Sequence, residues 1–442
     1  MGIMDFQTYL SDRKELEYKF FPGINFVYPN VMSDKNSAFR NELMSQFDQI
    51  ERHTNPVTGN DQIVRKLANV RNLLLEITDD CNLRCRYCVY SGQFPDRRHH
   101  GNSKMDWSTA EAASDFFFDW VLKHEALRTM PYWLSVGFYG GEPLLNFDLI
   151  ENTVARCNKT FNEKILPLGF KSSSIGYTIT TNGLLLDEQI IDFLIKNNFF
   201  ITLSIDGPKE IHDRNKGKGN FDQLIRKINV LENNYPDFYR KKVLFSVVYN
   251  KDTDLQKVRD FFSQEIFENC QNIVYGYVND YFSDLNCPAF GLNEEQVIRS
   301  ILEKKKNKEP LFKIEEKILS QYFEFQFDHV GTRNIFGGYC TLGSKRMFVR
   351  VNGDLLGCER MSDSFKIGSI YSGFDLSRIM EIENDWYKNS KECMSCIVQG
   401  CCHACVGTVG YKNALNFDPY CKKARSNFFN KVKDYIEYKE IP

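Results

Sequence analysis

The sequence has no long hydrophobic run and no signal-peptide pattern. Although 42% of its 442 residues are hydrophobic, no apolar stretch approaches the ~20 residues that a helix needs to span a bilayer. The N-terminus lacks the basic and then apolar order of a secretion signal. We therefore expect a soluble, cytoplasmic protein without a membrane partner.

The sequence also has little net charge. Its 56 Lys and Arg residues are balanced by 58 Asp and Glu residues, which leaves a formal charge of -2. Nucleic acids and anionic lipid surfaces attract proteins through a concentrated basic face. Because the charge balance gives no sign of such a face, we expect no nucleic-acid partner, and the substrate has to be inferred from the candidate site.

Disulfide bonds are not expected, although the chain has 14 cysteines. Cytosolic thiols are kept reduced, and a chain of this length needs no covalent cross-links to fold. Metal ligation is therefore the leading interpretation, and the cysteines gather in two regions, one near residue 85 and one in the last quarter. The isolated Cys157, Cys270 and Cys287 are expected to be small buried hydrophobes.

From residue 73 to residue 278, short runs rich in β-branched and aromatic residues alternate with amphipathic stretches of helical length, which is typical of repeated βα units. The predicted strands are 73–78, 135–139, 176–181, 201–206, 243–249 and 272–278. The predicted helices are 108–124, with Ser108 as N-cap, 147–160, 187–196, 221–233 and 253–267. Six parallel strands predict an α/β fold, a partial TIM-like (β/α)6 barrel whose functional loops lie at the carboxyl ends of the strands.

A chain of this length exceeds the size at which one hydrophobic core stops growing, so we expect more than one domain. Residues 1–70 form an N-terminal extension that either docks the substrate or covers the barrel. Residues 71–290 hold the barrel, residues 291–335 form a helical bridge, and residues 336–442 form a cysteine-rich domain. Within the bridge, the three lysines at 304–306 are expected to face solvent.

Three cysteines, Cys81, Cys85 and Cys88, follow the first predicted strand in T-D-D-C-N-L-R-C-R-Y-C. Thiolates are the usual ligands of iron–sulfur clusters, and three thiolates from one short loop leave one iron of a four-iron cubane without a protein ligand. The alternative is a structural zinc site, which needs four ligands, and His99 and His100 are more than ten residues away. We favour a cluster with an open iron.

This loop resembles the C-x3-C-x2-C loop of the radical S-adenosylmethionine (SAM) superfamily, which holds a 4Fe–4S cluster chelated by SAM. Three further strand ends agree with that family: Y-G-G-E-P at 139–143, T-T-N-G at 180–183 and S-I-D-G-P at 204–208. The resemblance implies that Glu142 receives the SAM amino group, that Ser204 and Asp206 face the ribose and methionyl part, and that Arg226 is a candidate for the carboxylate. The remaining implied SAM contacts are Tyr139, Gly140, Gly141, Thr181 and Asn182.

Residues 336–427 resemble the SPASM domain, the extension with two auxiliary 4Fe–4S clusters found in radical SAM peptide and protein maturases. The resemblance assigns Cys340, Cys358 and Cys405 to the first auxiliary cluster. It assigns Cys393, Cys396, Cys402 and Cys421 to the second.

Two departures from the SPASM pattern matter. One residue is missing between Cys396 and Cys405, so either Cys401 or Cys402 is the ligand in that segment. In addition, the family's cysteine shortly before the position of Cys340 is absent, because no cysteine lies between Cys287 and Cys340. The first auxiliary cluster would then have an open iron, which accepts a soft thiolate such as a substrate cysteine.

The resemblance implies a radical SAM enzyme that carries out an oxidoreductase-type modification of a peptide. The cofactors implied are SAM and three 4Fe–4S clusters, and SAM cleavage yields a 5'-deoxyadenosyl radical that removes hydrogen from a carbon. The preferred function is maturation of a ribosomally made precursor peptide, in which a peptide cysteine closes a thioether of the sactipeptide or ranthipeptide type. The partners implied are the precursor peptide and an electron donor such as flavodoxin or ferredoxin.

Several alternatives remain open at this point. Anaerobic sulfatase maturases, which form formylglycine, have an Asp directly after the position of Cys358, where this chain has Glu359, a candidate catalytic base. Carbon–carbon crosslinking and epimerisation of peptides use similar scaffolds. A non-catalytic iron–sulfur protein would leave the motifs at 139–143 and 204–208 without a role.

Overall fold

The computed structural model describes residues 59–92, 98–128, 133–168, 174–249, 253–270, 272–277, 292–322, 342–396, 404–422, 424–425, 434 and 437–438. In part of the strand at 272–277 and of the helix that begins at 292, it describes the backbone alone. It also describes the backbone of three N-terminal strands. Those strands, β1 (Met4–Thr8), β2 (Leu16–Phe21) and β3 (Phe26–Pro29), form an antiparallel sheet. The predicted ligands Cys340, Cys401 and Cys402 lie outside the described residues.

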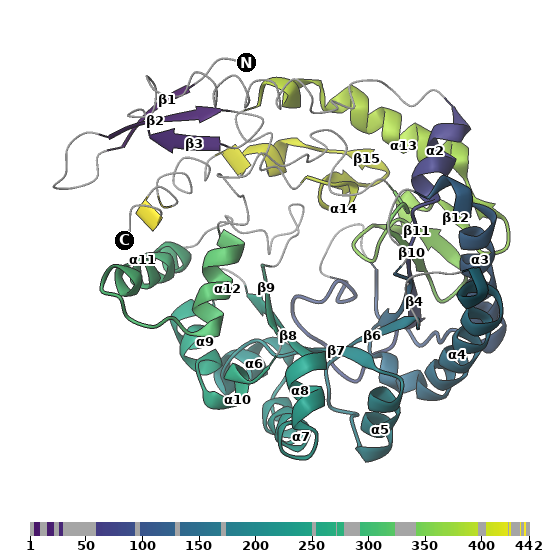
Figure 1. Ribbon diagram of the computed structural model, residues 1–442, viewed down its shortest axis with the longest axis horizontal. Coiled ribbons are helices and arrows are strands. Elements are labelled where there is room, and N and C mark those ends of the chain that lie inside the picture. The colour runs from purple at the N-terminus through teal and green to yellow at the C-terminus, as the bar shows by residue number, and fades with distance from the viewer. Residues whose placement is uncertain are drawn as a thin grey trace.

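Six parallel strands form the centre of the molecule, as predicted. They are β4 (Asn72–Thr78), β5 (Ser135–Gly140), β6 (Gly176–Thr181), β7 (Phe199–Ser204), β8 (Val243–Tyr249) and β9 (Asn272–Tyr277), paired in that order. In Figure 1 they form an arc, with the helices outside it. The predicted α/β fold and partial barrel are confirmed, with β7 beginning two residues earlier than expected because Phe199 is already buried.

The helices around the arc include those at the predicted positions, together with three that were not predicted. They are α2 (Asn60–Leu67), α3 (Trp107–Lys123), α4 (Phe147–Thr160), α5 (Glu188–Lys196), α6 (Lys209–Lys216), α7 (Asn220–Asn234), α8 (Pro236–Lys242), α9 (Leu255–Phe262) and α10 (Glu265–Glu268). The helices that were not predicted are α2, α6 and α8. Short helices, 3-10 or π, also occur at Glu125–Leu127, Pro143–Asn146, Phe161–Ile165 and Leu166–Leu168. No helix in the described part of the chain is long and apolar enough to cross a membrane.

Two details of the helix prediction are wrong. The N-cap of α3 is Asp106 rather than Ser108, because the Asp106 carboxylate accepts a hydrogen bond from the backbone N–H of Thr109 at 2.7 Å. The predicted helix 253–267 is two helices, since α9 ends where the Ser263 hydroxyl donates to the Arg259 carbonyl at 2.8 Å.

Two of the three isolated cysteines are buried, as expected of structural cysteines. These are Cys157 and Cys270. The third, Cys287, lies outside the described residues, and its burial stays a prediction.

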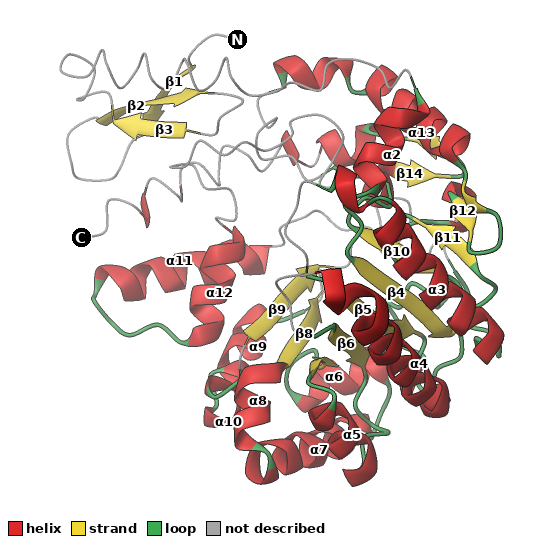
Figure 2. Cartoon of the chain, turned by 45° about the vertical axis from the view of Figure 1, so that its right-hand side comes forward, coloured by secondary structure: helices red, strands yellow, loops and turns green. Residues whose placement is uncertain are grey.

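The sheet does not end at β4. Strand β10 (Arg346–Val349) pairs with β4 in parallel. Strands β11 (Asp354–Leu356), β12 (Gly368–Ser369) and β13 (Gly373–Phe374) then extend the sheet, each antiparallel to the strand before it. Figure 2 shows β10 and β11 continuing the sheet beyond β4. The C-terminal region thus shares one ten-stranded sheet with the barrel, and the predicted domain boundary at residue 336 stays a prediction.

The rest of the described C-terminal region packs beside this extension. It comprises the short helix Asp363–Phe365, helix α13 (Leu376–Asn389), the short helix Lys391–Ser395, α14 (Val406–Val409) and the hairpin of β14 (Gly410–Tyr411) and β15 (Ala414–Leu415). Helix α13 is tied to α2 by an ion pair between Lys66 and Glu383 at 3.0 Å.

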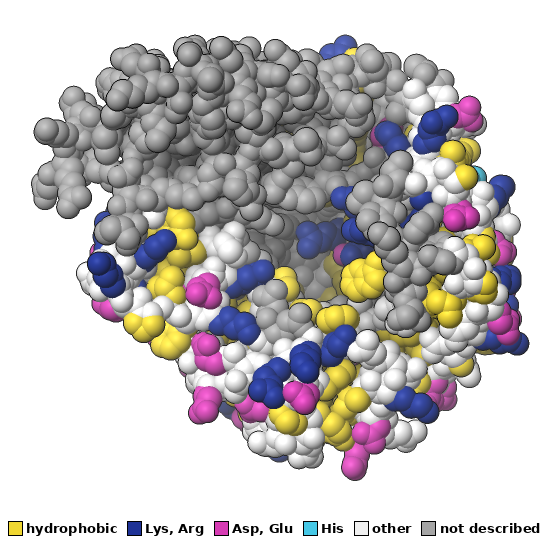
Figure 3. All heavy atoms as spheres, viewed as in Figure 1, with side chains coloured by type: hydrophobic (Ala, Val, Ile, Leu, Met, Phe, Trp, Pro, Cys, Tyr) yellow, Lys and Arg dark blue, Asp and Glu magenta, His cyan; other side chains and the backbone are white. Residues whose placement is uncertain are grey.

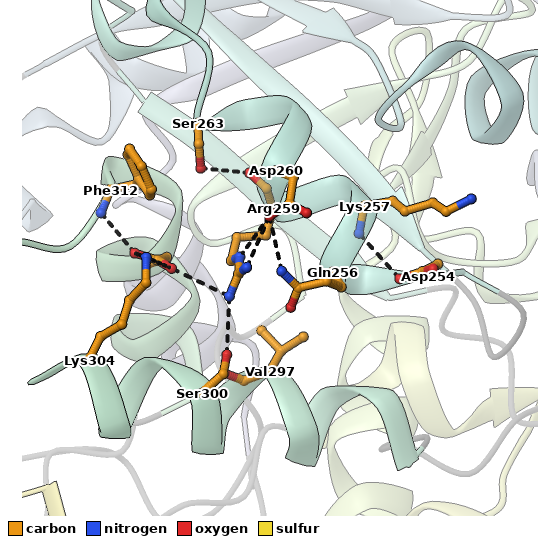
Figure 4. Close-up of polar contacts among 11 residues, drawn as sticks. Asp254, Gln256, Lys257, Arg259, Asp260, Ser263, Val297, Ser300, Lys304 and Phe312 are labelled. Carbon is orange, nitrogen blue, oxygen red and sulfur yellow. Dashed lines mark hydrogen bonds and ion pairs between the residues drawn. The ribbon is translucent and has the colours of Figure 1, made fainter.

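The helical bridge consists of α11 (Leu292–Lys306) and α12 (Lys313–Tyr322), which pack against α9. Glu315 on α12 is fully buried and accepts hydrogen bonds from Lys304 at 2.8 Å and from the backbone N–H of Phe312 at 2.9 Å. Arg259 on α9 pairs with the same carboxylate at 3.6 Å (Figure 4). One buried carboxylate therefore fastens the bridge to the barrel.

The prediction that the lysines at 304–306 face solvent is confirmed for Lys306, which is exposed, and is wrong for Lys304 and Lys305, which are half-buried. Lys304 pairs with Glu315, Lys305 Nζ lies 3.5 Å from the centre of the Tyr438 ring, and Lys306 pairs with a glutamate near the C-terminus. Lys304 therefore joins the two helices of the bridge, while Lys305 and Lys306 hold the bridge to residues near the C-terminus. A run of three charges does not reveal these roles.

We expect Glu315→Gln to destabilise the protein by about 3 kcal/mol, because it leaves Arg259 and Lys304 without their buried counter-charge. The measurement is the thermal unfolding midpoint of the full chain. Glu316→Gln is the matched control, since Glu316 is the exposed neighbour on the same helix, and it should leave the midpoint unchanged. Equal midpoints for both variants would contradict the role of Glu315.

Candidate active site

The three-cysteine loop follows β4 and is held by its own polar groups. The Cys81 N–H donates to the Asp80 carboxylate at 2.8 Å, the Leu83 N–H points to Cys81 Sγ at 3.3 Å, and the Tyr90 N–H points to Cys88 Sγ at 3.4 Å. N–H groups aimed at sulfur stabilise it in its anionic, metal-ligating form. Among the described residues, no group of three or more His, Cys, Asp and Glu side chains is gathered closely enough to hold a single metal ion.

The thiols of this loop need metal to lose their protons. Burial raises the pKa of Cys81 to about 12 and that of Cys85 to about 11, and the neighbouring cysteines raise both pKa values further. Near neutral pH these thiols are therefore neutral, and iron binding must displace their protons. Soft sulfur donors with inward-pointing N–H groups fit an iron–sulfur cluster held by Cys81, Cys85 and Cys88.

The backbone of the Y-G-G-E-P motif at the end of β5 packs directly against this loop. The Gly141 N–H donates to the Thr78 carbonyl and the Glu142 N–H to the Asp80 carbonyl, both at 2.8 Å. A Cβ on Gly141 would lie 2.0 Å from the Asp80 oxygen, and Gly140 has a φ of +136°. Glycine is therefore required here by the approach of one backbone to another, independently of any bound ligand.

We expect Gly141→Ala to displace the cysteine loop and to lower the iron content by about four atoms per chain, the content of one cubane. The measurement is iron and sulfide analysis after anaerobic reconstitution. Gly59→Ala is the control, because a Cβ at Gly59 meets no atom within 4 Å. An unchanged iron content in Gly141→Ala would show that the close approach does not control cluster retention.

Glu142 joins the end of β5 to the end of β6. Its fully buried carboxylate accepts hydrogen bonds from the Thr181 hydroxyl at 2.7 Å and from the backbone N–H groups of Asn182 at 2.8 Å and Leu144 at 3.1 Å. Burial raises the pKa of Glu142, and the bonds from Asn182 and Thr181 oppose that rise. The structure thus places three of the predicted SAM contacts together, and their binding of SAM stays a prediction.

Asn182 connects the same cluster of strand ends to the cysteine loop. Its amide nitrogen donates to the Asn82 side-chain oxygen at 2.7 Å and lies 3.9 Å from Cys81 Sγ. Its side-chain oxygen accepts a hydrogen bond from the Leu184 N–H at 3.0 Å, which fixes the turn after β6.

Asp206, after β7, holds the other side of the cysteine loop. Its fully buried carboxylate accepts a hydrogen bond from the Tyr87 hydroxyl at 2.8 Å and one from the Asn215 amide at 3.1 Å, and it lies 4.0 Å from Lys216 Nζ. Burial raises the pKa of Asp206, while Lys216 and the bond from Tyr87 lower it. His212 accepts a hydrogen bond from the Asp206 N–H at 3.5 Å, and burial lowers the pKa of His212 to about 3, so it is neutral.

The structure does not bring every predicted contact into this group. Ser204 is half-buried at the end of β7, opposite Ser246 of β8. Arg226 lies on the exposed side of α7, whose buried residues are Leu224, Ile228 and Leu231. The predicted contact of Arg226 with the SAM carboxylate stays a prediction without support from its position.

In the space-filling view of Figure 3 the molecule is hollowed near its middle, and Lys and Arg side chains are visible in the hollow.

The family model described as the radical SAM superfamily matches residues 75–262, the span that contains the cysteine loop and these strand ends. This span is a radical SAM domain. The chain is 25% identical over 403 residues to the radical SAM cyclopropyl synthase TigE from Paramaledivibacter caminithermalis, which covers 86% of this chain and 76% of that protein. It is 24% identical over 393 residues to a cysteine-type anaerobic sulfatase-maturating enzyme from Clostridium perfringens, which covers 83% of this chain and 95% of that protein.

The fold also resembles a solved structure. The structure of anSMEcpe with bound AdoMet and Cp18Cys peptide aligns with a TM-score of 0.58 and 21% identity over 84% of this chain and 99% of that one. At this identity the likeness shows the fold, which includes the region beyond the barrel. The chain is thus a radical SAM enzyme with a C-terminal extension.

A buried ion network joins the barrel of this radical SAM enzyme to the extension. Glu76 of β4 is fully buried, accepts a hydrogen bond from the Tyr90 hydroxyl at 2.5 Å and pairs with Arg350 at 2.5 Å and with Arg98 at 3.8 Å. Arg98 is 3% exposed, lies 5.1 Å from the centre of the Tyr90 ring and donates to the backbone carbonyl of Glu359. Sequence reasoning missed this network, because its members are isolated charges in unrelated segments.

The structure describes five of the predicted auxiliary ligands, whose assignment to two clusters stays a prediction: Cys358, Cys393, Cys396, Cys405 and Cys421. Cys405 begins α14, and a Cβ on Gly407 would lie 3.7 Å from Cys405 Sγ and 3.2 Å from the Cβ of Arg360, two residues after Cys358. Cys396 and Cys421 lie close enough for the charge of Cys396 to raise the pKa of Cys421, behind the larger effect of burial. The complete ligand sets stay a prediction, because Cys340, Cys401 and Cys402 lie outside the described residues.

Glu359 lies at the junction between the extension and the barrel. It pairs with Arg346 at 2.5 Å. Burial would raise the pKa of Glu359, but Arg346 and Arg360 outweigh it and hold the pKa below the usual range. Burial and the charge of Glu359 together raise the pKa of Tyr139 to about 12, which places Glu359 beside the Y-G-G-E-P motif. The candidate base is thus ionised and close to the predicted SAM site.

Proposed function

We propose that this enzyme matures a ribosomally made peptide by joining a peptide cysteine to a carbon in a thioether. The observation that carries the proposal is the position of Cys358 and Glu359, which the buried Glu76–Arg98 network fastens to the strand that bears the cysteine loop. A substrate held at the first auxiliary cluster would therefore lie at the edge of the barrel. The absence of a cysteine between Cys287 and Cys340 supports a vacant iron that takes the substrate sulfur.

The similar proteins support a peptide or protein substrate. The solved structure with the same fold holds AdoMet and a Cys-containing peptide, and the sulfatase-maturating relative acts on a protein, as its name states. We infer that this chain likewise binds SAM at the cysteine loop and a peptide over the barrel, and that flavodoxin or ferredoxin supplies the electron.

When bound and reduced, the loop cluster supplies the electron that cleaves SAM and so generates the radical. The chain's own residues orient and shield that chemistry. Glu142 and Asn182 fix the strand ends beside the cluster loop, and Asp206 fixes Tyr87 against its other side. Glu359 is ionised and is the candidate acceptor of the proton that the peptide loses. Across the reaction, the peptide loses one hydrogen atom from carbon to the 5'-deoxyadenosyl radical, one proton from sulfur to Glu359, and one electron, which an auxiliary cluster would accept. It gains a carbon–sulfur bond.

A second candidate function is carbon–carbon bond formation in the peptide. The observation in its favour is the similarity to a cyclopropyl synthase over 86% of this chain. This reaction also removes two hydrogens, so peptide mass alone does not separate it from thioether formation. The state of the peptide thiol does, because a thioether consumes the thiol and a carbon–carbon bond leaves it free. Formylglycine formation differs from both, since it replaces the sulfur with oxygen.

The proposal predicts that a short cysteine-containing peptide encoded beside this protein loses two hydrogens and one alkylatable thiol per crosslink. The enzyme is incubated with the peptide, SAM and a reductant, and the product is treated with iodoacetamide before mass spectrometry. The variant Cys81→Ala, Cys85→Ala, Cys88→Ala is the control and should leave the peptide unchanged. Loss of two hydrogens with the thiol still alkylated would replace the thioether proposal with carbon–carbon bond formation.

Glu359→Gln tests the candidate base. We expect peptide modification to fall about a hundredfold, which is typical for removal of a general base, while SAM cleavage without peptide continues. The ratio of modified peptide to 5'-deoxyadenosine measures this uncoupling. Glu381→Gln, an exposed carboxylate on α13, should leave the ratio unchanged. An unchanged ratio in Glu359→Gln would remove Glu359 from the mechanism.

A further inference from the structure

Lys216 is a buried cation beside the cysteine loop, and none of the motifs at the strand ends includes it. It is the last residue of α6 and only 4% exposed. A helix C-terminus favours a cation, but such a residue usually keeps its charged end in water. Burying an ammonium group is costly unless negative charge compensates it, so the burial of Lys216 requires a separate explanation.

Asp206 compensates this charge only in part. Lys216 Nζ is 4.0 Å from the Asp206 carboxylate, beyond hydrogen-bond distance. That carboxylate already accepts hydrogen bonds from Tyr87, from Asn215 and from the Val248 N–H at 3.4 Å. Among the described residues, no hydrogen bond is donated by the Lys216 side chain. The ammonium group therefore retains positive charge that other neighbours must balance.

The cysteine loop provides that balance once it holds metal. Lys216 Nζ lies 5.7 Å from the centre of the Tyr87 ring, and Tyr87 stands between Cys85 and Cys88. The Arg86 N–H donates to the backbone carbonyl of Asn215 at 2.9 Å, which fixes the end of α6 against the loop. The cation therefore lies beside the loop segment from Cys85 to Cys88, whose thiols become thiolates when iron binds.

We propose that Lys216 is a positioned counter-charge that stabilises the reduced state of the loop cluster. Reduction adds one negative charge to the cluster, and a fixed buried cation nearby favours that charge because the surroundings screen it weakly. Lys216 thus makes the cluster easier to reduce, and Asp206 moderates the effect. This inference rests on the loop cluster of the proposed function, but it does not depend on the peptide or on the bond that is formed.

The test is a redox titration of the full-length reconstituted enzyme, followed by electron paramagnetic resonance without SAM and without peptide. The loop cluster is identified as the signal absent from the variant in which Cys81, Cys85 and Cys88 are alanine. At the wild-type midpoint, Lys216→Met is expected to lower the reduced-to-oxidised ratio at least tenfold, equivalent to about 59 mV for one electron. Asp206→Asn removes negative charge from the same place and is expected not to lower the ratio.

Two controls separate charge from structure. Lys216→Arg keeps the charge and should stay within about twofold of wild type, and Lys209→Met removes an exposed lysine from the same helix and should cause no shift. Lys216→Gln provides the same comparison as Lys216→Met if the Met variant retains less iron. The proposal is overturned if Lys216→Met and Lys216→Gln match wild type, or if Asp206→Asn lowers the ratio to the same extent. It is also overturned if these variants weaken SAM binding alone, because Lys216 would then be a ligand of SAM.

Discussion

Strand β4 carries a constraint on which both halves of the molecule depend: it is paired on both edges and holds a buried carboxylate in its middle. It pairs with β5 of the barrel and with β10 of the extension, and the cysteine loop leaves from its end. The buried Glu76 carboxylate is compensated by Arg350, Arg98 and the Tyr90 hydroxyl. Two of these partners come from the segment that begins with the cysteine loop, and the third directly follows β10. The loop and the extension are therefore held in one orientation by the same charge.

Much of the fold was predictable because it depends on local patterns. The strand positions follow from short β-branched and aromatic runs, and the parallel order follows from the helices between them. The motifs at strand ends were also predictable, since parallel strands bring their carboxyl ends to one edge. The two wrong helix predictions came from local side-chain hydrogen bonds. Asp106, not Ser108, caps the N-terminus of α3, and the Ser263 hydroxyl bonds to the backbone where the predicted helix 253–267 is divided in two. The auxiliary ligand sets stay predictions, because Cys340, Cys401 and Cys402 lie outside the described part of the chain.

The site itself was only partly predictable, because its stabilising contacts join distant segments. Asp206 and Tyr87 are 119 positions apart, and Arg98 and the Glu359 carbonyl are 261 positions apart. In α6, the buried face includes Ile211, His212, Asn215 and Lys216, so a polar stretch in the sequence is an interior face in the structure. A hydrophobic pattern cannot identify such a face. Only the charge that Lys216 meets in three dimensions indicates why a lysine is buried there.

The pairing of β10 with β4 also determines the order in which the protein assembles. Glu76 and Arg350 are 274 positions apart, and contacts at such separation form late because a long chain segment must first be closed. During synthesis, all six barrel strands are present before β10 exists. Until then, one edge of β4 has unpaired backbone groups and the Glu76 carboxylate is open to water. The edge of β4 that β10 covers in the folded protein therefore stays without its partner strand until the last quarter of the chain is made.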